Sequence, residues 1–175
     1  RSDNNAGCNS LSSPAASGNF SARNSWDGNG PGQYSISQSF TVASNLDSAK
    51  LSWWNTWDVW EGSNLDLRLF DVDLLDDSGA LIGNVFSHSL AVGQNDLDWT
   101  LNSFDITSLL SSHEGLDVTL SFTNYVPLNH NGPGAFGLDG ISLDIESVAV
   151  SEPGSLALFG LGLAGIGWTR KKKSS

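Results

Sequence analysis

A group of four tryptophans is the densest set of potential binding residues in the sequence: Trp53, Trp54, Trp57 and Trp60. Side chains on a β-strand alternate between two faces, so Trp53 and Trp57 would point one way and Trp54 and Trp60 the other. An exposed indole can stack against the apolar face of a sugar ring, which makes these residues candidate ligand-binding residues for a neutral glycan. Large aromatics also fill sandwich cores, so the alternative in which all four pack inside stays open.

A run of acidic residues follows these tryptophans, at Asp71, Asp73, Asp76 and Asp77. A calcium-binding EF-hand loop needs oxygen ligands at alternate positions and a glycine at the sixth position. Leu75 stands at one of those ligand positions and no glycine stands at the sixth, so the run does not match such a loop. We expect a solvated strand end followed by a turn.

Other catalytic and metal-binding patterns are missing from the sequence. The histidines His88, His113 and His130 are widely separated, and no nucleophile motif or phosphate-binding glycine loop occurs. The carboxylates are too numerous to single out the pair that a glycosidase uses. Cys8 is the only cysteine, which excludes an internal disulfide. We therefore expect a protein that is not an enzyme.

Short strand-like runs separated by turn signals make up the central part of the chain. Residues 116–125, for example, place Leu116, Val118, Leu120 and Phe122 on one face. No helical pattern separates the runs, so they predict an all-β fold, an antiparallel sandwich. One helical turn is expected near Ser108 to His113. Comparable runs occur at residues 34–43, 49–57, 64–74, 80–90, 99–104 and 136–148.

The chain divides into three predicted parts with different compositions. Residues 1–30 are rich in Ser, Asn and Gly and are expected to form an extended arm, residues 31–150 hold the sandwich, and residues 151–175 form a tail. The first 150 residues contain only four basic residues against 18 acidic ones. Such an acidic surface repels nucleic acid and anionic lipid, and it suits neutral partners or divalent cations.

The tail combines a helix breaker, an apolar segment and a cluster of cations. Pro153 lacks a backbone donor, so regular structure should stop there. Residues 156–168 are apolar, and as a helix they would span roughly 20 Å, which is short for a bilayer core. Basic residues favour the cytoplasmic side, which would place the preceding domain outside. We predict a short transmembrane helix followed by the basic residues Arg170, Lys171, Lys172 and Lys173.

This three-part tail resembles the PEP-CTERM sorting signal, whose usual form is Val-Pro-Glu-Pro followed by a short Gly/Leu-rich helix and a basic cluster. The matching motif is Glu152, Pro153 and Gly154, with Ser151 in place of the first proline. The resemblance implies processing by an exosortase, a membrane transpeptidase-like enzyme of polysaccharide-producing Gram-negative bacteria. It also implies anchoring in the inner membrane before the tail is removed, and then delivery to the cell surface or extracellular matrix.

The central part resembles jelly-roll domains, the sandwiches of carbohydrate-binding modules and of many exported PEP-CTERM proteins. In such domains the aspartate near the start of the last strand often helps to coordinate a structural calcium ion with the N-terminal region. The resemblance therefore implies a Ca2+ ligand at Asp139, with Asp27 as the candidate second ligand. The motifs that carry it, in order, are Leu51-Ser52-Trp53-Trp54, residues 65–70, residues 98–106 and residues 136–143.

Together these features predict an exported, non-catalytic jelly-roll domain that binds neutral polysaccharide at the cell surface or in a biofilm matrix. The main alternative is a structural protein that self-associates, as an adhesin or fibre subunit. The arm at residues 1–30 motivates this alternative, because an extended segment can add a strand to the exposed sheet edge of a neighbour. A hydrolase is a third hypothesis.

Overall fold

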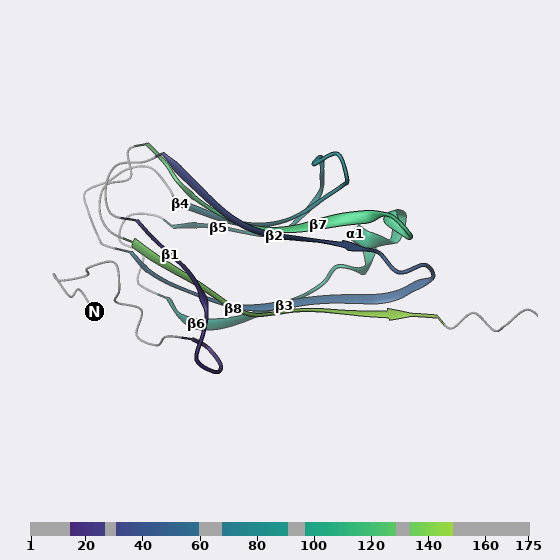
Figure 1. Ribbon diagram of the computed structural model, residues 1–175, viewed down its shortest axis with the longest axis horizontal. Coiled ribbons are helices and arrows are strands. Elements are labelled where there is room, and N and C mark those ends of the chain that lie inside the picture. Colours follow the sequence, from purple (N-terminus) through teal and green to yellow (C-terminus); the bar gives the residue numbers. More distant parts are fainter. Residues whose placement is uncertain (1–14, 27–30, 60–67, 91–96, 129–133, 149–175) are drawn as a thin grey trace, which may run out of the picture.

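Eight strands and one short helical region form the part of the protein that the computed structural model describes, residues 15–26, 31–59, 68–90, 97–128 and 134–148. The strands pack as two antiparallel layers (Figure 1). The strands are β1 (Ala22–Trp26), β2 (Gly32–Thr41), β3 (Leu46–Val59), β4 (Arg68–Leu75), β5 (Leu81–Leu90), β6 (Leu97–Asp105), β7 (Asp117–Val126) and β8 (Gly134–Ser147), with the helical elements α1 (Thr107–Leu110) and η1 (Ser111–His113) between β6 and β7.

The strand order within the two sheets defines the fold. One sheet has the order β1-β8-β3-β6 and the other has the order β2-β7-β4-β5. An eight-stranded antiparallel double sheet connected in this way is a jelly roll, so the predicted all-β jelly-roll sandwich is confirmed. The predicted C-terminal hydrophobic helix lies outside the described residues. Within the described ranges, no helix has the length and apolar character that a membrane crossing requires.

The first strand lies in the region predicted to be an extended arm. β1 pairs with β8 in an antiparallel register that runs from Ala22 opposite Leu138 to Trp26 opposite Gly134. Its sequence, Ala-Arg-Asn-Ser-Trp, lacks the alternation of apolar and polar residues that indicates a strand. The sandwich therefore begins before residue 31, and residues 22–26 belong to it.

The core follows from the alternation of apolar side chains in the central strands. Every second residue of β4 is buried, from Arg68 through Phe70 and Val72 to Leu74. Trp53 of β3 lies at the centre with 0% of its surface exposed, and its ring centroid is 5.5 Å from those of Phe104 and Phe122. Burying an aromatic side chain of this size contributes strongly to the stability of a sandwich.

The turn between β4 and β5 is built around one carboxylate. Oδ1 of Asp76 accepts hydrogen bonds from the Ser78 hydroxyl at 2.7 Å and from the Ala80 amide at 2.8 Å. Gly79 adopts a φ of +83°, which favours glycine. Asp71 and Asp73 accept hydrogen bonds from side chains of β5, so the predicted strand end and turn are confirmed.

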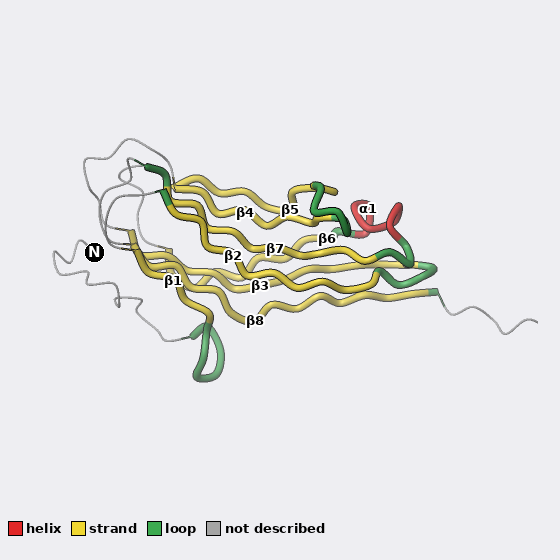
Figure 2. The backbone as a smooth tube through the Cα atoms, turned by 45° about the horizontal axis from the view of Figure 1, so that its top comes forward, coloured by secondary structure: helices red, strands yellow, loops and turns green. Residues whose placement is uncertain are grey.

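One end of the sandwich is closed by the short helical region. The α1 helix lies at the end opposite β1 (Figure 2). Leu110 of this helix is fully buried, and the Ile106 amide that precedes the helix donates to the Ala49 carbonyl oxygen at 2.9 Å. The helical elements α1 and η1 confirm the helical turn predicted near Ser108 to His113.

Candidate binding site

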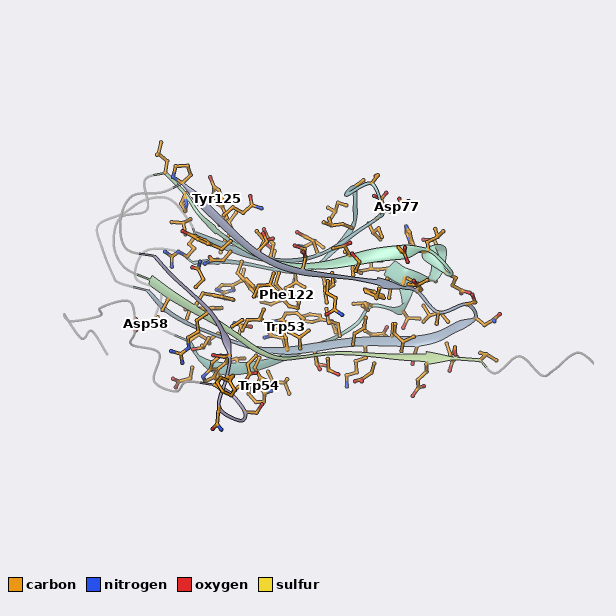
Figure 3. All side chains as sticks on the ribbon, in the orientation of Figure 1. Trp53, Trp54, Asp58, Asp77, Phe122 and Tyr125 are labelled. Atoms are coloured by element: carbon orange, nitrogen blue, oxygen red, sulfur yellow. The ribbon has the colours of Figure 1, made fainter. Side chains whose placement is uncertain are left out.

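The predicted tryptophan group separates onto two faces of β3. Trp53 and Trp57 point into the sandwich, where 0% and 6% of their surfaces are exposed. Trp54 is half-buried on the outer face of the same strand, and Figure 3 shows it on the opposite side of the sheet from Trp53. Trp60 lies outside the described residues. Trp53 therefore has no free ring face for a ligand in this conformation.

The outer position of Trp54 is shaped by its neighbours on β6 and β8. Leu101, its partner on β6, is 52% exposed, so an apolar surface continues beside the indole. A Cβ atom added to Gly140 of β8 would lie 3.1 Å from Cδ1 of Trp54. Gly140 thus permits the close approach of the indole, and it also has a φ of +56°. Among the described residues, Trp54 and Leu101 thus form an apolar platform on this outer face.

A cavity of about 380 Å³ opens at the side of the sandwich, between the edge strands β1 and β2. Its volume lies within the usual range of small-molecule sites. Ile36 of β2 lines it and remains 48% exposed, which shows that the two layers are open to solvent along this edge. The walls carry polar side chains such as Asn24 and Gln33, and the floor is made by the aromatic residues Phe70, Phe122 and Phe136.

An asparagine pair spans the two layers at this cavity. The side-chain amide nitrogen of Asn124, on β7, donates to Oδ1 of Asn24, on β1, over 3.3 Å. Asn124 is only 4% exposed, and its Oδ1 atom is buried with no hydrogen-bond partner among the described residues. A buried polar atom without a partner costs free energy, so a residue that lines the cavity carries an acceptor that is left unsatisfied.

One buried polar atom of Asn124 lacks a partner among the described residues in either orientation of its side-chain amide. Exchanging the oxygen and nitrogen would leave a buried donor in place of a buried acceptor. A hydroxyl group can donate or accept, so it satisfies either orientation. Sugars carry many hydroxyls beside apolar C–H faces, and the cavity combines an unsatisfied amide with an aromatic floor.

We call the surrounding region the polar end of the interior, defined by Asn24, Asn55, Trp57, Arg68, His88 and Asn124. Asn55 is satisfied, because its Oδ1 atom accepts from Nε1 of Trp53 at 3.1 Å. Within the described part of the chain, by contrast, Nε and Nη2 of Arg68, Nε1 of Trp57 and Nε2 of His88 are buried without partners. Burial lowers the pKa of Arg68 to about 10, although nearby Tyr34 opposes the change.

The predicted calcium ligands are placed differently by the structure. Oδ2 of Asp139 accepts hydrogen bonds from the backbone amides of Ala16 and Ser17, each at 2.9 Å, and its Oδ1 accepts from the Gly140 amide at 2.7 Å. The N-terminal region therefore approaches Asp139 through N–H donors. Asp27 lies outside the described residues. The described ranges contain no group of three or more His, Cys, Asp or Glu side chains placed to hold a metal, and the calcium site stays a prediction.

The residues that line the cavity were not predicted from the sequence. Two polar residues of this region nevertheless stand at positions that the strand pattern assigns to the interior. Arg68 stands in phase with Phe70 and Leu74, and Asn124 stands in phase with Leu120 and Phe122. The side-chain period of a strand is two, so a polar residue in the apolar phase must point inward. An inward polar residue in a sandwich strand marks an unusual position, and both residues lie at the polar end.

Comparison with known proteins supports the interpretation of the tail. Residues 149–171 match the family described as the PEP-CTERM protein-sorting motif. That motif indicates an exported protein, and it includes the predicted Glu152, Pro153 and Gly154, which lie outside the described residues. No curated protein matches the chain significantly.

Several solved structures are similar to this chain at low sequence identity. The structure of TmCBM61 in complex with beta-1,4-galactotriose has 15% identity, covers 77% of each chain and gives a TM-score of 0.49. A CBM4 structure has 12% identity, covers 72% of this chain and 84% of that one, and gives a TM-score of 0.39. A second module of carbohydrate-binding family 16 has 14% identity, 75% and 80% coverage and a TM-score of 0.37. The galactotriose is a property of TmCBM61 and does not define the ligand of this chain.

Proposed function

We propose that this protein is an exported, non-catalytic β-sandwich that binds neutral polysaccharide in the cavity between β1 and β2. The observation that carries the proposal is the cavity with its aromatic lining, to which Asn124 contributes a buried amide oxygen that has no partner in the described part of the chain. A sugar hydroxyl would donate a hydrogen bond to this oxygen, and the aromatic residues of the cavity would contact the apolar face of the sugar ring.

The charge of the chain supports a neutral ligand. The formal net charge is −11, so a polyanionic chain would be repelled over the whole surface. Binding would then depend on hydrogen bonds and ring contacts, and it would depend little on salt concentration. A weak salt dependence would distinguish this mode of binding from attraction to a charged polymer.

The experiment begins with an array of neutral oligosaccharides and then uses calorimetry on the best binder. We expect Asn124→Leu to weaken binding roughly tenfold or more, because one buried hydrogen bond to the ligand is lost. Trp54→Ala, on the outer face of the same sandwich, is the matched control and should bind as the parent does. Loss of binding in Trp54→Ala with normal binding in Asn124→Leu would move the site to the outer face.

The tail supports the proposed destination. We infer that the exosortase-type enzyme removes it and that the domain reaches the surface or the extracellular matrix. Substitution of Glu152 and Pro153 by alanine should leave the unprocessed chain in the inner membrane, detected by its larger mass. Replacement of Ser174 and Ser175, beyond the matched motif, is the control. Unchanged processing and release of the first variant would contradict the proposed sorting.

One observation favours self-association as a second function. Among the described residues, β1 pairs with β8 only as far as Leu138, so the following residues of β8 to Ser147 have β3 as their one strand partner. An open edge of this kind can accept a strand. A chain that begins at residue 15 tests the arm without removing β1. Unchanged size-exclusion behaviour of that chain would exclude the arm as the connector.

A further inference from the structure

The strand β2 forms one edge of its sheet. Its one strand partner among the described residues is β7, and the pairing runs from Gly32 to Thr41 without a register shift. Every residue from Ser35 to Ser39 is exposed, including Ile36 and Gln38, which point inward opposite core residues of β7. The backbone N–H and C=O groups on the free side of β2 therefore lack a strand partner in the described part of the chain.

The other open edges of the described sheets carry features that discourage pairing with a second chain. β1 has only five residues, β6 contains two aspartates, and β8 contains three acidic residues beyond its pairing with β1. β5 lacks Asp, Glu, Lys and Arg, but its pairing with β4 shifts register at two points. β2 is ten residues long and has no charged side chain, no proline and no register shift. Natural sheets use these devices to block their edges, so β2 is the edge best suited to accept a strand.

The sequence of β2 is nearly symmetric about Ser37. In an antiparallel pair of two copies with Ser37 opposite its own counterpart, each residue faces its mirror position on the other strand. A two-fold contact of this kind requires a self-complementary surface, and the mirror positions of β2 carry matching side chains. The facing pairs, from the centre outward, are Ile36 with Gln38, Ser35 with Ser39, and Tyr34 with Phe40.

These pairs are of the kinds that stabilise a sheet. Tyr34 and Phe40 both point to the inner face, so two aromatic pairs would form across the contact. The serine positions lie on the outer face, where the hydroxyl of Ser39 is 2.8 Å from that of Thr119 on β7, and serines facing each other there can continue the row of hydrogen bonds. Pairing would also cover part of Ile36, which is 48% exposed.

The charge of the chain favours the same edge. The formal net charge is −11, so two copies repel each other over most of their surfaces. An uncharged strand of ten residues is a place where two copies can approach without placing like charges opposite each other.

We propose that the free edge of β2 pairs with β2 of a second copy of this chain, antiparallel and with Ser37 at the two-fold axis. The two four-stranded sheets would become one continuous sheet across the dimer. The contact is symmetric and closes on itself, so it gives a dimer and not a fibre. The inference rests on the self-association proposed above and deepens it, because it names β2 as the connector in place of the arm and the β8 edge.

Sedimentation velocity of the full chain over a range of concentrations tests the dimer. We expect a monomer–dimer equilibrium in the parent. Ser37→Lys places two like charges opposite each other at the axis, and it should weaken dimerisation roughly tenfold or more. Ser103→Lys makes the same change in net charge at an exposed serine of the edge strand β6, and it should dimerise as the parent does. A parent that is monomeric at every concentration, or an undiminished dimer in Ser37→Lys, would overturn the proposal.

Cysteine cross-linking tests the register. The variants are made in a Cys8→Ser background, which removes the one native cysteine. Ser37→Cys should form a disulfide between two copies on mild oxidation, because each cysteine faces its counterpart. Ser39→Cys faces Ser35, so it should cross-link with a Ser35→Cys chain and not with itself. Self-linking of Ser39→Cys, or a dimeric sample in which Ser37→Cys forms no disulfide, contradicts the proposed register.

The chain that begins at residue 15 separates this connector from the arm. Pairing through β2 predicts that the shortened chain still dimerises and that Ser37→Lys still weakens its dimer. Dimerisation that is lost in the shortened chain but kept in Ser37→Lys would overturn β2 as the connector and support the arm. Asn124→Leu, which tests the binding of neutral polysaccharide, should dimerise as the parent does, so a failure of that binding is distinguishable from a failure of the β2 contact.

Discussion

The two ends of the sandwich interior share the strands β3, β4 and β7 but are filled in opposite ways. The apolar end is packed with aliphatic side chains that are at most 1% exposed, whereas the polar end buries amide, indole and guanidinium groups beside the half-buried imidazole of His88. Several of those groups have no partner in the described part of the chain. The apolar end stabilises the fold, and the polar end contains groups that remain able to form hydrogen bonds to a ligand. The apolar end comprises Val42, Leu51, Leu74, Ile106, Leu110 and Val118.

The largest effect is expected at the apolar end. Leu51→Ala should lower the free energy of unfolding by about 2–5 kcal/mol, because the substitution removes buried methyl groups and leaves a cavity. Leu81→Ala makes the same change at a side chain that is 61% exposed, and it should alter stability by less than about 0.5 kcal/mol. Denaturant unfolding measures both. Equal losses in the two variants would contradict the described packing.

Two asparagines at the polar end should respond to the same substitution by different amounts. Asn55→Leu removes the acceptor for Nε1 of Trp53 and for the amide of Asn102, and it should cost about 1–3 kcal/mol. Asn124→Leu removes an oxygen that lacks a partner in the described residues together with a long hydrogen bond to Asn24, so it should cost less, about 0–1 kcal/mol. Thermal unfolding of the ligand-free variants separates the two. A loss in Asn124→Leu as large as that in Asn55→Leu would show that the oxygen of Asn124 is already satisfied.

A smaller effect is expected where Asp139 holds the N-terminal turn. Asp139→Ala removes the acceptor of three backbone N–H groups, and it should cost about 1–2 kcal/mol. Asp144→Ala, on the same strand, is the control. The variant also tests the predicted calcium site, since a metal role requires calcium to raise the melting temperature of the parent over a chelator. A rise in the parent that disappears in Asp139→Ala would support calcium, and no rise would count against it.

The smallest effect is expected in the exposed turn between β4 and β5. The Ser78 hydroxyl, and after it the Ala80 amide, lowers the pKa of Asp76 below its usual value of 3.8. The lowered folded-state pKa means that this contribution is present above about pH 4 and is lost as the pH falls through the folded pKa. Asp76→Ala should therefore lower the melting temperature slightly at neutral pH, with a difference from the parent that shrinks in acid. Asp77→Ala is the control, and a difference that grows in acid would contradict this account.

The two-layered fold could be predicted from the sequence more readily than the binding surface. The alternation in β4 and β7 predicts their buried faces, because each strand buries one face against the opposite sheet. The cavity could not be predicted in the same way, since it forms where β1 and β2 leave the edges of two sheets apart. The exposure of Trp53, Trp54 and Trp57 also depended on local detail, because β3 contains register shifts on both sides of Trp54.

Amide and indole NMR signals during titration with the best neutral oligosaccharide test the central claim most directly. The polar end is proposed to take the ligand, so the side-chain amide signals of Asn24 and Asn124 should shift in proportion to occupancy. The indole signal of Trp54, on the outer face of β3, should stay in place. A shift of the Trp54 signal with both asparagine signals unchanged would contradict the account and place binding on the outside of the sandwich.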